Sequence, residues 1–249
     1  MRILGVIPAR YASTRFPGKL LKEVGGKSIL RMVYEQCKKT KSLNRVVVAT
    51  DNELVYQHVE SFGGDVLMTS ESHQSGTDRC AEVAKELHGN TDFDFIVNIQ
   101  GDEPLIDPDT IDSLCSQLDI DTQILTAYKP IKTLDELLNP NLVKVVLGEK
   151  KQALYFSRSP IPHIRGIAVD EWLKKNTFFQ HIGLYVYSVE VLEKIVKFPV
   201  AKLENLEKLE QLRWLSNGFK INGVEVESES IGIDTREDFE ALKQFLGYK

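Results

Sequence analysis

Apolar runs of strand length alternate with helical stretches through the first half of the chain, and this alternation constrains the fold more than any other feature. The strand-like runs are Ile3–Ile7, Arg45–Thr50, Asp65–Met68, Phe95–Ile99 and Ile124–Ala127. The helical stretches that separate several of them are Ile29–Lys39, Glu53–Phe62, Thr77–Leu87 and Pro108–Leu118. Because such alternation is typical of βαβ units, we predict an α/β protein with a mixed, mostly parallel central sheet flanked by helices.

The second half of the chain follows a less regular pattern. We predict a hairpin of two strands, Leu142–Leu147 and Ala153–Phe156, followed by an irregular stretch over 160–178. A strand at Gly183–Tyr187, a helix at Leu203–Leu215, a strand at Ile221–Val226 and a helix at Arg236–Leu246 complete the chain. The first of these two helices is predicted from leucines at every third position, with Gly218 as its stop. No linker or repeat divides the chain, so we predict one domain over residues 1–249, with an excursion around 130–180.

Composition excludes several classes of protein. The net charge of −5 argues against nonspecific nucleic-acid binding, which relies on broad basic surfaces. Cys37, Cys80 and Cys115 are odd in number and widely spaced, which favours reduced thiols over disulfides or a zinc site. No signal peptide and no apolar run of membrane-spanning length is present. We therefore expect a cytoplasmic protein without membrane insertion.

A cationic loop follows the first strand. Arg10, Arg15 and Lys19 lie in it beside Ser13 and Thr14, and no acidic residue precedes position 23. Ligands bind at the carboxyl ends of strands in open α/β sheets, and three fixed cations suit a polyphosphate. The alternative is a solvated basic loop, so spacing alone makes phosphate binding a hypothesis.

Two aspartates each follow an apolar strand. Asp102 comes directly after Gly101 at the end of one strand, and Asp234 lies between a strand and a helix near the end of the chain. Mg²⁺ prefers a few carboxylates together with phosphate oxygens, so both are candidate ligands. The alternatives are an acidic turn for Asp102 and a helix N-cap for Asp234. The pair could bind one ion only if the fold brings the two strand ends together.

Several common motifs are absent. Gly25-Gly26-Lys27-Ser28 resembles part of a P-loop, but Leu21 stands where that pattern requires glycine, and Ser28 suits a helix N-cap instead. GxGxxG and GxSxG do not occur, and the histidines lack metal-ligand spacing. These absences argue against a dinucleotide-binding dehydrogenase and an α/β-hydrolase.

Seven segments together resemble the 3-deoxy-manno-octulosonate cytidylyltransferase family, in family order and over nearly the full length. They are Ile7–Leu21, His73–Arg79, Val97–Pro104, Ala153–Arg158, His181–Tyr185, Leu209–Arg213 and Gly232–Asp238. The first and third occur in looser form across sugar nucleotidyltransferases, whereas HQSGTDR and LEQLR make the set specific. The departures are Leu20 and Arg236, where proline is common, and an individual sequence over 163–178.

The resemblance implies a Rossmann-like nucleotidyltransferase fold, a homodimer that uses the excursion, and Mg²⁺-dependent transfer of CMP from CTP to 3-deoxy-manno-octulosonate (Kdo) for lipopolysaccharide biosynthesis. It also implies residue roles. Triphosphate binding falls to Arg10, Ser13, Arg15 and Lys19; cytosine to Pro8 and Ala9; the rest of the nucleotide pocket to Gln74, Ser75, Gly76 and Arg79; Mg²⁺ to Asp102 and Asp234; and the sugar acid to Gln100, Arg158, His181, Tyr185, Glu210 and Gln211. Among these, Lys19, Arg10, Arg15, Asp102 and Asp234 would be catalytic.

Taken singly, several of these residues have plainer interpretations. His181 suits a structural histidine, Tyr185 a core position, and Arg79 a charge on a helix surface, while Glu210 and Gln211 suit the solvated face of the leucine-rich helix. Two other functions remain open. One is a cytidylyltransferase for a related acid, such as an 8-amino Kdo analogue or a sialic acid. The other is a catalytically silent nucleotide-binding protein, which need not keep both metal carboxylates.

Overall fold

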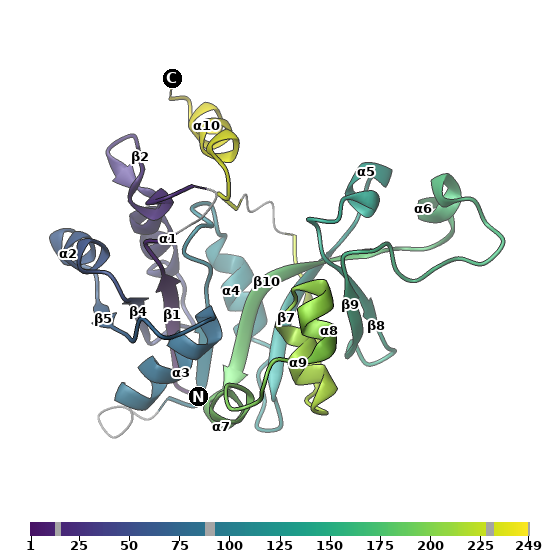
Figure 1. Cartoon of the computed structure of the whole chain (residues 1–249), viewed down its shortest axis with the longest axis horizontal. Helices are drawn as coiled ribbons and strands as arrows, with labels where there is room; N and C mark the ends of the chain where they lie inside the picture. The colour runs from purple at the N-terminus through teal and green to yellow at the C-terminus, as the bar shows by residue number, and fades with distance from the viewer. Residues whose placement is uncertain (13–15, 88–92, 228–231, 249) are drawn as a thin grey trace.

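A seven-strand path forms the body of the computed structural model, which describes residues 1–12, 16–87, 93–227 and 232–248 (Figure 1). The strand order is β11-β7-β10-β6-β1-β4-β5, and β8 and β9 extend the sheet beside β10. The strands are β1 Ile3–Ala9, β2 Glu23–Val24, β3 Lys27–Ser28, β4 Arg45–Thr50, β5 Val66–Met68, β6 Phe95–Asn98, β7 Ile124–Pro130, β8 Lys144–Leu147, β9 Ala153–Ser157, β10 Phe179–Ser188 and β11 Ile221–Glu225.

The helices alternate with these strands. They are η1 Lys19–Leu21, α1 Ile29–Cys37, α2 Glu53–Ser61, α3 Gly76–Leu87, α4 Pro108–Cys115, α5 Leu134–Leu138, η2 Val169–Glu171, α6 Trp172–Lys175, α7 Val189–Ile195, α8 Lys202–Glu207, α9 Gln211–Ser216 and α10 Arg236–Phe245. Several helices begin at a polar N-cap residue whose side chain accepts a hydrogen bond from a backbone N–H group of the first turn. Ser28 caps α1, as predicted, and Asn52 caps α2 through bonds to backbone N–H groups.

Strand direction confirms the mostly parallel sheet. β1 runs parallel to β4 and β6, and β4 runs parallel to β5. β10 is antiparallel to both of its neighbours on the main path, β6 and β7, whereas β11 is parallel to β7. The chain builds outward from β1 to β5 and then returns to the other side of β1 to form β6. The carboxyl ends of β1 and β6 therefore flank a topological switch point, where ligands bind in open α/β sheets.

Alternate residues of the strands contribute to two hydrophobic cores, one on each face of the sheet. In β1, Ile3 and Ile7 face the side covered by α1, α2, α4 and α10, while Leu4 and Val6 face the side covered by α3, α7 and α9. Burial on both faces explains why the parallel strands are continuous apolar runs. A third, smaller cluster comprises Ile131, Leu137, Trp172 and Phe178.

The predicted excursion is a projection of β8, β9, α5 and α6 to one side of the sheet (Figure 1). The third cluster lies at its centre, with the rings of Trp172 and Phe178 stacked 5.8 Å apart. The single-domain organisation and the role of this projection in dimerisation stay predictions. Within the described ranges, no helix is long and apolar enough to cross a membrane.

The structure differs from the sequence-based prediction at a few elements. β10 begins at Phe179, four residues before the predicted strand, and α7 was not predicted. The predicted helix Leu203–Leu215 is wrong as one element, because Lys208 adopts φ 53° and ψ 46° and separates α8 from α9. A left-handed residue reverses the local path of the backbone, so the leucines do not share one face. Leu206 is 70% exposed, whereas Leu209 and Leu212 are buried.

Candidate active site

The loops after β1 and β6 meet closely at the switch point. A side-chain carbon at Gly101 would lie 2.9 Å from the carbonyl oxygen of Pro8, which is too close for any residue but glycine. Gly101 therefore allows the loop after β6 to approach the backbone of β1 closely, near the carboxyl end of that strand. This contact places Asp102 directly beside the segment that carries Lys19.

The ammonium of Lys19 joins three segments that are remote in the sequence. Its Nζ lies 2.6 Å from Oδ2 of Asp102, 3.0 Å from Oδ1 of Asp234 and 2.7 Å from the carbonyl oxygen of Ile233. The Ile233 N–H also donates to the Asp102 carbonyl at 2.9 Å. Gly18, at φ 66°, turns the chain into η1 and presents Lys19. The fold thus brings Asp102 and Asp234 together, at a lysine that we assigned to phosphate.

Electrostatics keep this lysine charged. Burial alone would lower the pKa of Lys19, but the charge and hydrogen bond of Asp102, followed by those of Asp234, raise it above its ordinary value. The Lys19 side chain is 11% exposed, against 28% for Asp102 and 48% for Asp234. The carboxylates therefore remain open to solvent on one side while their shared counter-ion is covered.

The segment before and into α3 forms a second part of the site. Arg10 donates through Nη2 to the carbonyl of His73 at 2.9 Å, which fixes the guanidinium over this loop. Burial, and then the charge of Arg79, lower the pKa of Arg10. The backbone N–H groups of Gln74 and Ser75 both donate to Oδ2 of Asp78, at 3.2 Å and 3.0 Å. The loop is therefore held by α3 and lies against the carboxyl end of β1.

The start of α3 also contacts the carboxyl end of β1 directly, through Gly76 and Pro8. A side-chain carbon at Gly76 would lie 3.3 Å from Cγ of Pro8, so the start of α3 packs directly on the carboxyl end of β1. Ala9 is fully buried in the core on the opposite face of the sheet, and the Gln74 side chain is exposed, with its amide donating to the Ser72 carbonyl. Pro8 and the segment 74–76 therefore lie close together, with Ala9 next to Pro8 in the strand. Their role in a nucleotide pocket stays a prediction. Ser13 and Arg15 lie outside the described residues.

Arg79 is not a charge on a helix surface. It is fully buried, and its guanidinium bonds Asp51 through Nη2 and the hydroxyl of Thr69 through Nη1 at 2.7 Å. Asp51 follows β4 and Thr69 follows β5, so Arg79 ties α3 to the ends of two strands. Its role in nucleotide binding stays a prediction.

Glu210 likewise does not lie on a solvated face. Its Oε2 accepts from the hydroxyl of Thr77 at 2.7 Å, which links α9 to α3 across the site. Burial raises the pKa of Glu210 despite the opposing hydrogen bond from Thr77. Gln211 is 4% exposed, and within the described part of the chain its Nε2 has no hydrogen-bond partner. The plain interpretation as exposed helix residues is therefore wrong for both.

A bulge in β10 gathers the next group of side chains. Pairing with β7 shifts register between Ile182 and Tyr185, and Gln100 donates to the carbonyl of Gly183 at 3.0 Å. The hydroxyl of Thr126 contacts Nε2 of His181 at 2.9 Å. Burial lowers the pKa of His181 from its ordinary value of 6.5 to about 3, so the imidazole is neutral. His181 therefore also satisfies the plainer interpretation as a structural histidine.

Tyr185 occupies the core side of the same strand. Its ring packs edge-on against Trp214, with ring centroids 5.1 Å apart, and lies 5.3 Å from His181. Burial raises the pKa of its hydroxyl, and this buried oxygen has no partner among the described residues. A buried hydroxyl without a partner is costly unless a ligand or water bonds it.

Arg158 is fixed at the end of β9. Its Nε donates to the carbonyl of Glu207 at 2.8 Å and its Nη1 to the carbonyl of Pro140 at 3.0 Å. The Glu207 carboxylate in turn accepts from the Arg158 N–H at 2.9 Å and from the Ser157 hydroxyl at 2.6 Å. The guanidinium is therefore oriented by α8 rather than loosely placed.

Sequence reasoning missed the partners that hold these groups. They are Asp51, Thr77, Asp78, Thr126 and Glu207. Thr77 and Asp78 stand inside the HQSGTDR segment and could have been named from it. Thr126 and Glu207 carry no local signal, because each is defined only by a strand or helix pairing that the fold creates.

The donors around Lys19 fit the chemistry of Mg²⁺. Asp102, Asp234 and the Ile233 carbonyl all present oxygen atoms, which Mg²⁺ prefers. Where side chains are described, no three His, Cys, Asp or Glu residues form a metal cluster. None is needed for Mg²⁺, which is commonly held by one or two carboxylates plus substrate phosphates.

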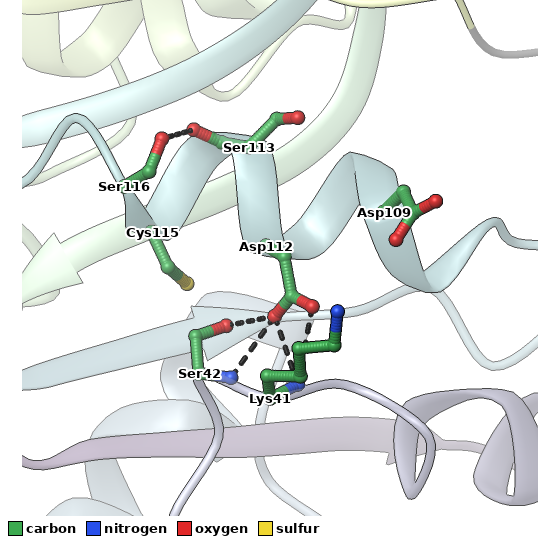
Figure 2. A pocket seen from close by; sticks show the side chains of 7 residues that line it. All are labelled: Lys41, Ser42, Asp109, Asp112, Ser113, Cys115 and Ser116. Carbon is green, nitrogen blue, oxygen red and sulfur yellow. Dashed lines mark hydrogen bonds between the residues drawn. The ribbon is translucent and has the colours of Figure 1, made fainter.

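A hollow of about 510 Å³ lies elsewhere, between α4 and the loop before β4 (Figure 2). Asp112 occupies its centre and accepts from the backbone N–H groups of Lys41 and Ser42 at 3.1 Å and 3.0 Å. Burial opposes ionisation of Asp112, but these donors and the Ser42 hydroxyl lower its pKa. The carboxylate thus anchors the loop before β4 to α4.

Comparison with known proteins places this geometry in context. A protein-family profile described as Cytidylyltransferase matches residues 4–222. Two relatives named 3-deoxy-manno-octulosonate cytidylyltransferase, from Parabacteroides distasonis and Bacteroides thetaiotaomicron, are each 50% identical to this chain. Each alignment covers 99% of this chain and 98% of the relative.

Solved structures agree. The structure of CMP:2-keto-3-deoxy-manno-octonic acid synthetase complexed with CTP is 37% identical, covers 99% of both chains and superimposes with a TM-score of 0.90. A cytidylyltransferase from Leptospira borgpetersenii, 21% identical with a TM-score of 0.65 over 100% of this chain and 88% of its own, shares the fold alone. The predicted Rossmann-like nucleotidyltransferase fold is confirmed.

Proposed function

We propose an activity for this chain, which belongs to the 3-deoxy-manno-octulosonate cytidylyltransferase family: it transfers CMP from CTP to the anomeric hydroxyl of Kdo and releases pyrophosphate. The observation that carries the proposal is the convergence of Lys19, Asp102 and Asp234 beside the switch point of the sheet. A silent binding protein has no need of two carboxylates at this place. The 50% identity over nearly the whole length favours Kdo over other acids.

The reaction needs alignment and charge stabilisation more than covalent chemistry. The anomeric hydroxyl oxygen forms a bond to the α-phosphorus, the bond from that phosphorus to pyrophosphate breaks, and the hydroxyl proton is released. Arg10 and Lys19 would supply positive charge for the phosphates, because both guanidinium and ammonium groups make charge-assisted bonds to them. Arg10 is already oriented by the His73 carbonyl.

Magnesium is part of this proposal. Asp102 and Asp234 would hold Mg²⁺, which supplies neutralisation of the phosphate charge and a lowered pKa for the attacking hydroxyl. The two carboxylates already lie within 3.0 Å of one cationic group, so they are close enough together to share a single cation. Their partial exposure leaves a side open toward substrate.

The sugar acid would be held by the groups beyond the nucleotide motifs. Arg158 is fixed by backbone carbonyls and can pair with the carboxylate of Kdo. Tyr185 and Gln211 carry buried polar atoms that lack partners among the described residues, and the hydroxyls of Kdo could bond them. Gln100, His181 and Glu210 would add further polar contacts.

We also propose a cytoplasmic homodimer that makes CMP-Kdo for lipopolysaccharide biosynthesis. Cys37, Cys80 and Cys115 are buried and unbridged, which suits a reducing compartment. Exposed apolar side chains on the lateral projection and on or just before α8, to which the end of β9 is hydrogen-bonded, support dimerisation. They are Leu138, Leu154, Ile167, Val169, Val200, Leu203 and Leu206.

A direct assay tests the activity. The purified chain is incubated with CTP and Mg²⁺, and with Kdo, its 8-amino analogue or a sialic acid in parallel, while pyrophosphate is measured. Kdo is expected to give the highest kcat/KM. A strong preference for the 8-amino analogue would replace Kdo but retain cytidylyl transfer, whereas no pyrophosphate with any acid would refute the proposal.

A further inference from the structure

Lys19 fills all three donor positions of its ammonium with acceptors that also suit a divalent cation. The acceptors are two carboxylates and the carbonyl oxygen of Ile233, all within 3.0 Å of Nζ. An ammonium donates at most three hydrogen bonds, so the group is saturated in this state. It holds the place between Asp102 and Asp234 that a shared metal ion would need.

Because of these contacts, Lys19 and a metal ion would compete for the same carboxylates. A divalent cation bound by both carboxylates would bring two positive charges close to the ammonium, and partial burial weakens solvent screening between them. The ammonium also has the advantage of being tethered, since an intramolecular group competes at a high effective concentration. In the nucleotide-free chain, the lysine and the metal ion therefore compete for the same carboxylates.

We propose that Lys19 is an exchangeable internal cation, which occupies the carboxylate pair in the free chain and yields it to the metal ion when nucleotide phosphates arrive. This rests on the proposed function, in that it takes CTP as the phosphate donor. The phosphates offer the ammonium alternative oxygens, and the divalent ion that accompanies them then occupies the two aspartates. Metal binding is thereby weak without nucleotide and strong with it.

Metal binding without any substrate is the first test, with Mn²⁺ as the probe and electron paramagnetic resonance as the readout. Lys19→Met should bind Mn²⁺ at least about tenfold more tightly than the unmodified chain, because one like charge at hydrogen-bond distance is removed. The control is Lys22→Met, which makes the same change in net charge at an exposed lysine of the same segment and should bind as the unmodified chain does.

A double variant tests whether the increase in Mn²⁺ affinity depends on the carboxylate pair. Lys19→Met combined with Asp234→Asn should return Mn²⁺ affinity to about that of the unmodified chain. Adding CTP should tighten Mn²⁺ binding strongly in the unmodified chain and in Lys22→Met, and much less in Lys19→Met. Lys19→Gln, which is neutral and retains a donor, serves where Lys19→Met does not fold.

Thermal unfolding gives a second readout that is independent of activity. Without metal, Lys19→Met should melt below the unmodified chain, because the ammonium that bonds both carboxylates is lost, and Mg²⁺ should restore much of the difference. Unchanged Mn²⁺ affinity in both folded Lys19 variants would overturn the exchange, even if CMP transfer is observed. Tighter Mn²⁺ binding in a chain that transfers no CMP would instead leave the competition standing and refute the proposed function.

Discussion

Asp102 and Asp234 are the side chains on which turnover should depend most. Replacing either one by asparagine should lower kcat by roughly two orders of magnitude or more, because metal neutralisation of developing charge is worth several kcal/mol. The measurement is pyrophosphate release at saturating Mg²⁺, with circular dichroism to show that the fold is retained. Asp121→Asn, at an exposed position, is the matched control and should leave kcat unchanged. Near-normal turnover in an Asp102 or Asp234 variant would remove that residue from the site.

His181 should make stability depend on pH. Its folded pKa, about 3, lies below its ordinary value of 6.5, so the unfolded chain binds more protons between these values. The contribution of His181 to the free energy of unfolding is therefore present above pH 6.5 and lost as the pH falls, by up to about 1.4 kcal/mol per pH unit.

Urea unfolding at pH 7.5 and pH 5 checks this. His181→Gln, which does not titrate, should lose less stability between the two pH values than the unmodified chain does. His163→Gln, at an exposed histidine, should behave as the unmodified chain. An identical pH dependence in all three proteins would show that His181 is not held neutral.

At the scale of residues, the sequence predicted identities better than partners. Asp102, Asp234 and Lys19 could each be selected from a local pattern, but the contact between them depends on positions 83 and 215 residues apart. Arg79 and Glu210 also show that a local pattern does not reveal the partners of a residue. Their charges favour exposed positions, and only the packing of α3 against β4, β5 and α9 creates the buried sites that they occupy.

At the scale of elements, the break between α8 and α9 can be tested through the left-handed conformation of Lys208. Lys208 has positive φ, which costs a non-glycine residue roughly 1 kcal/mol. Lys208→Gly and Lys208→Ala both remove the bond from Nζ to Asn205, and they differ in their tolerance of this conformation. The glycine variant should therefore be more stable to urea by about 1 kcal/mol. Equal stabilities would mean that the left-handed turn is not kept in solution.

The elements also show which patterns are reliable. Parallel strands buried on both faces were predicted well, because a short, continuous apolar run such as the one within Arg45–Thr50 is typical of such a strand. The leucine-rich segment was predicted as one helix because a spacing of three approximates helical periodicity. No local signal marked Lys208 as left-handed, and the early start of β10 depends on pairing with β7 and β8.

For the whole molecule, the exposed apolar side chains of the lateral projection and of α8 predict self-association. Light scattering after size exclusion should give about twice the chain mass of 28.2 kDa. Leu206→Asp and Leu154→Asp, at side chains that are 70% and 60% exposed, should shift the mass toward that of one chain. Leu54→Asp, at an exposed leucine on α2 at the opposite side of the sheet (Figure 1), should not. A single-chain mass for the unmodified protein would refute the homodimer.

The bonds from Lys19 to Asp102 and Asp234 have a consequence for synthesis on the ribosome. Asp234 is made 215 residues after Lys19, so a nascent chain carries Lys19 long before its last partner exists. Contacts of such sequence separation form late, since a long loop of chain must close first. The carboxylate pair therefore cannot be assembled around Lys19 until the chain has grown past Asp234, and until then it lacks this part of the proposed active site.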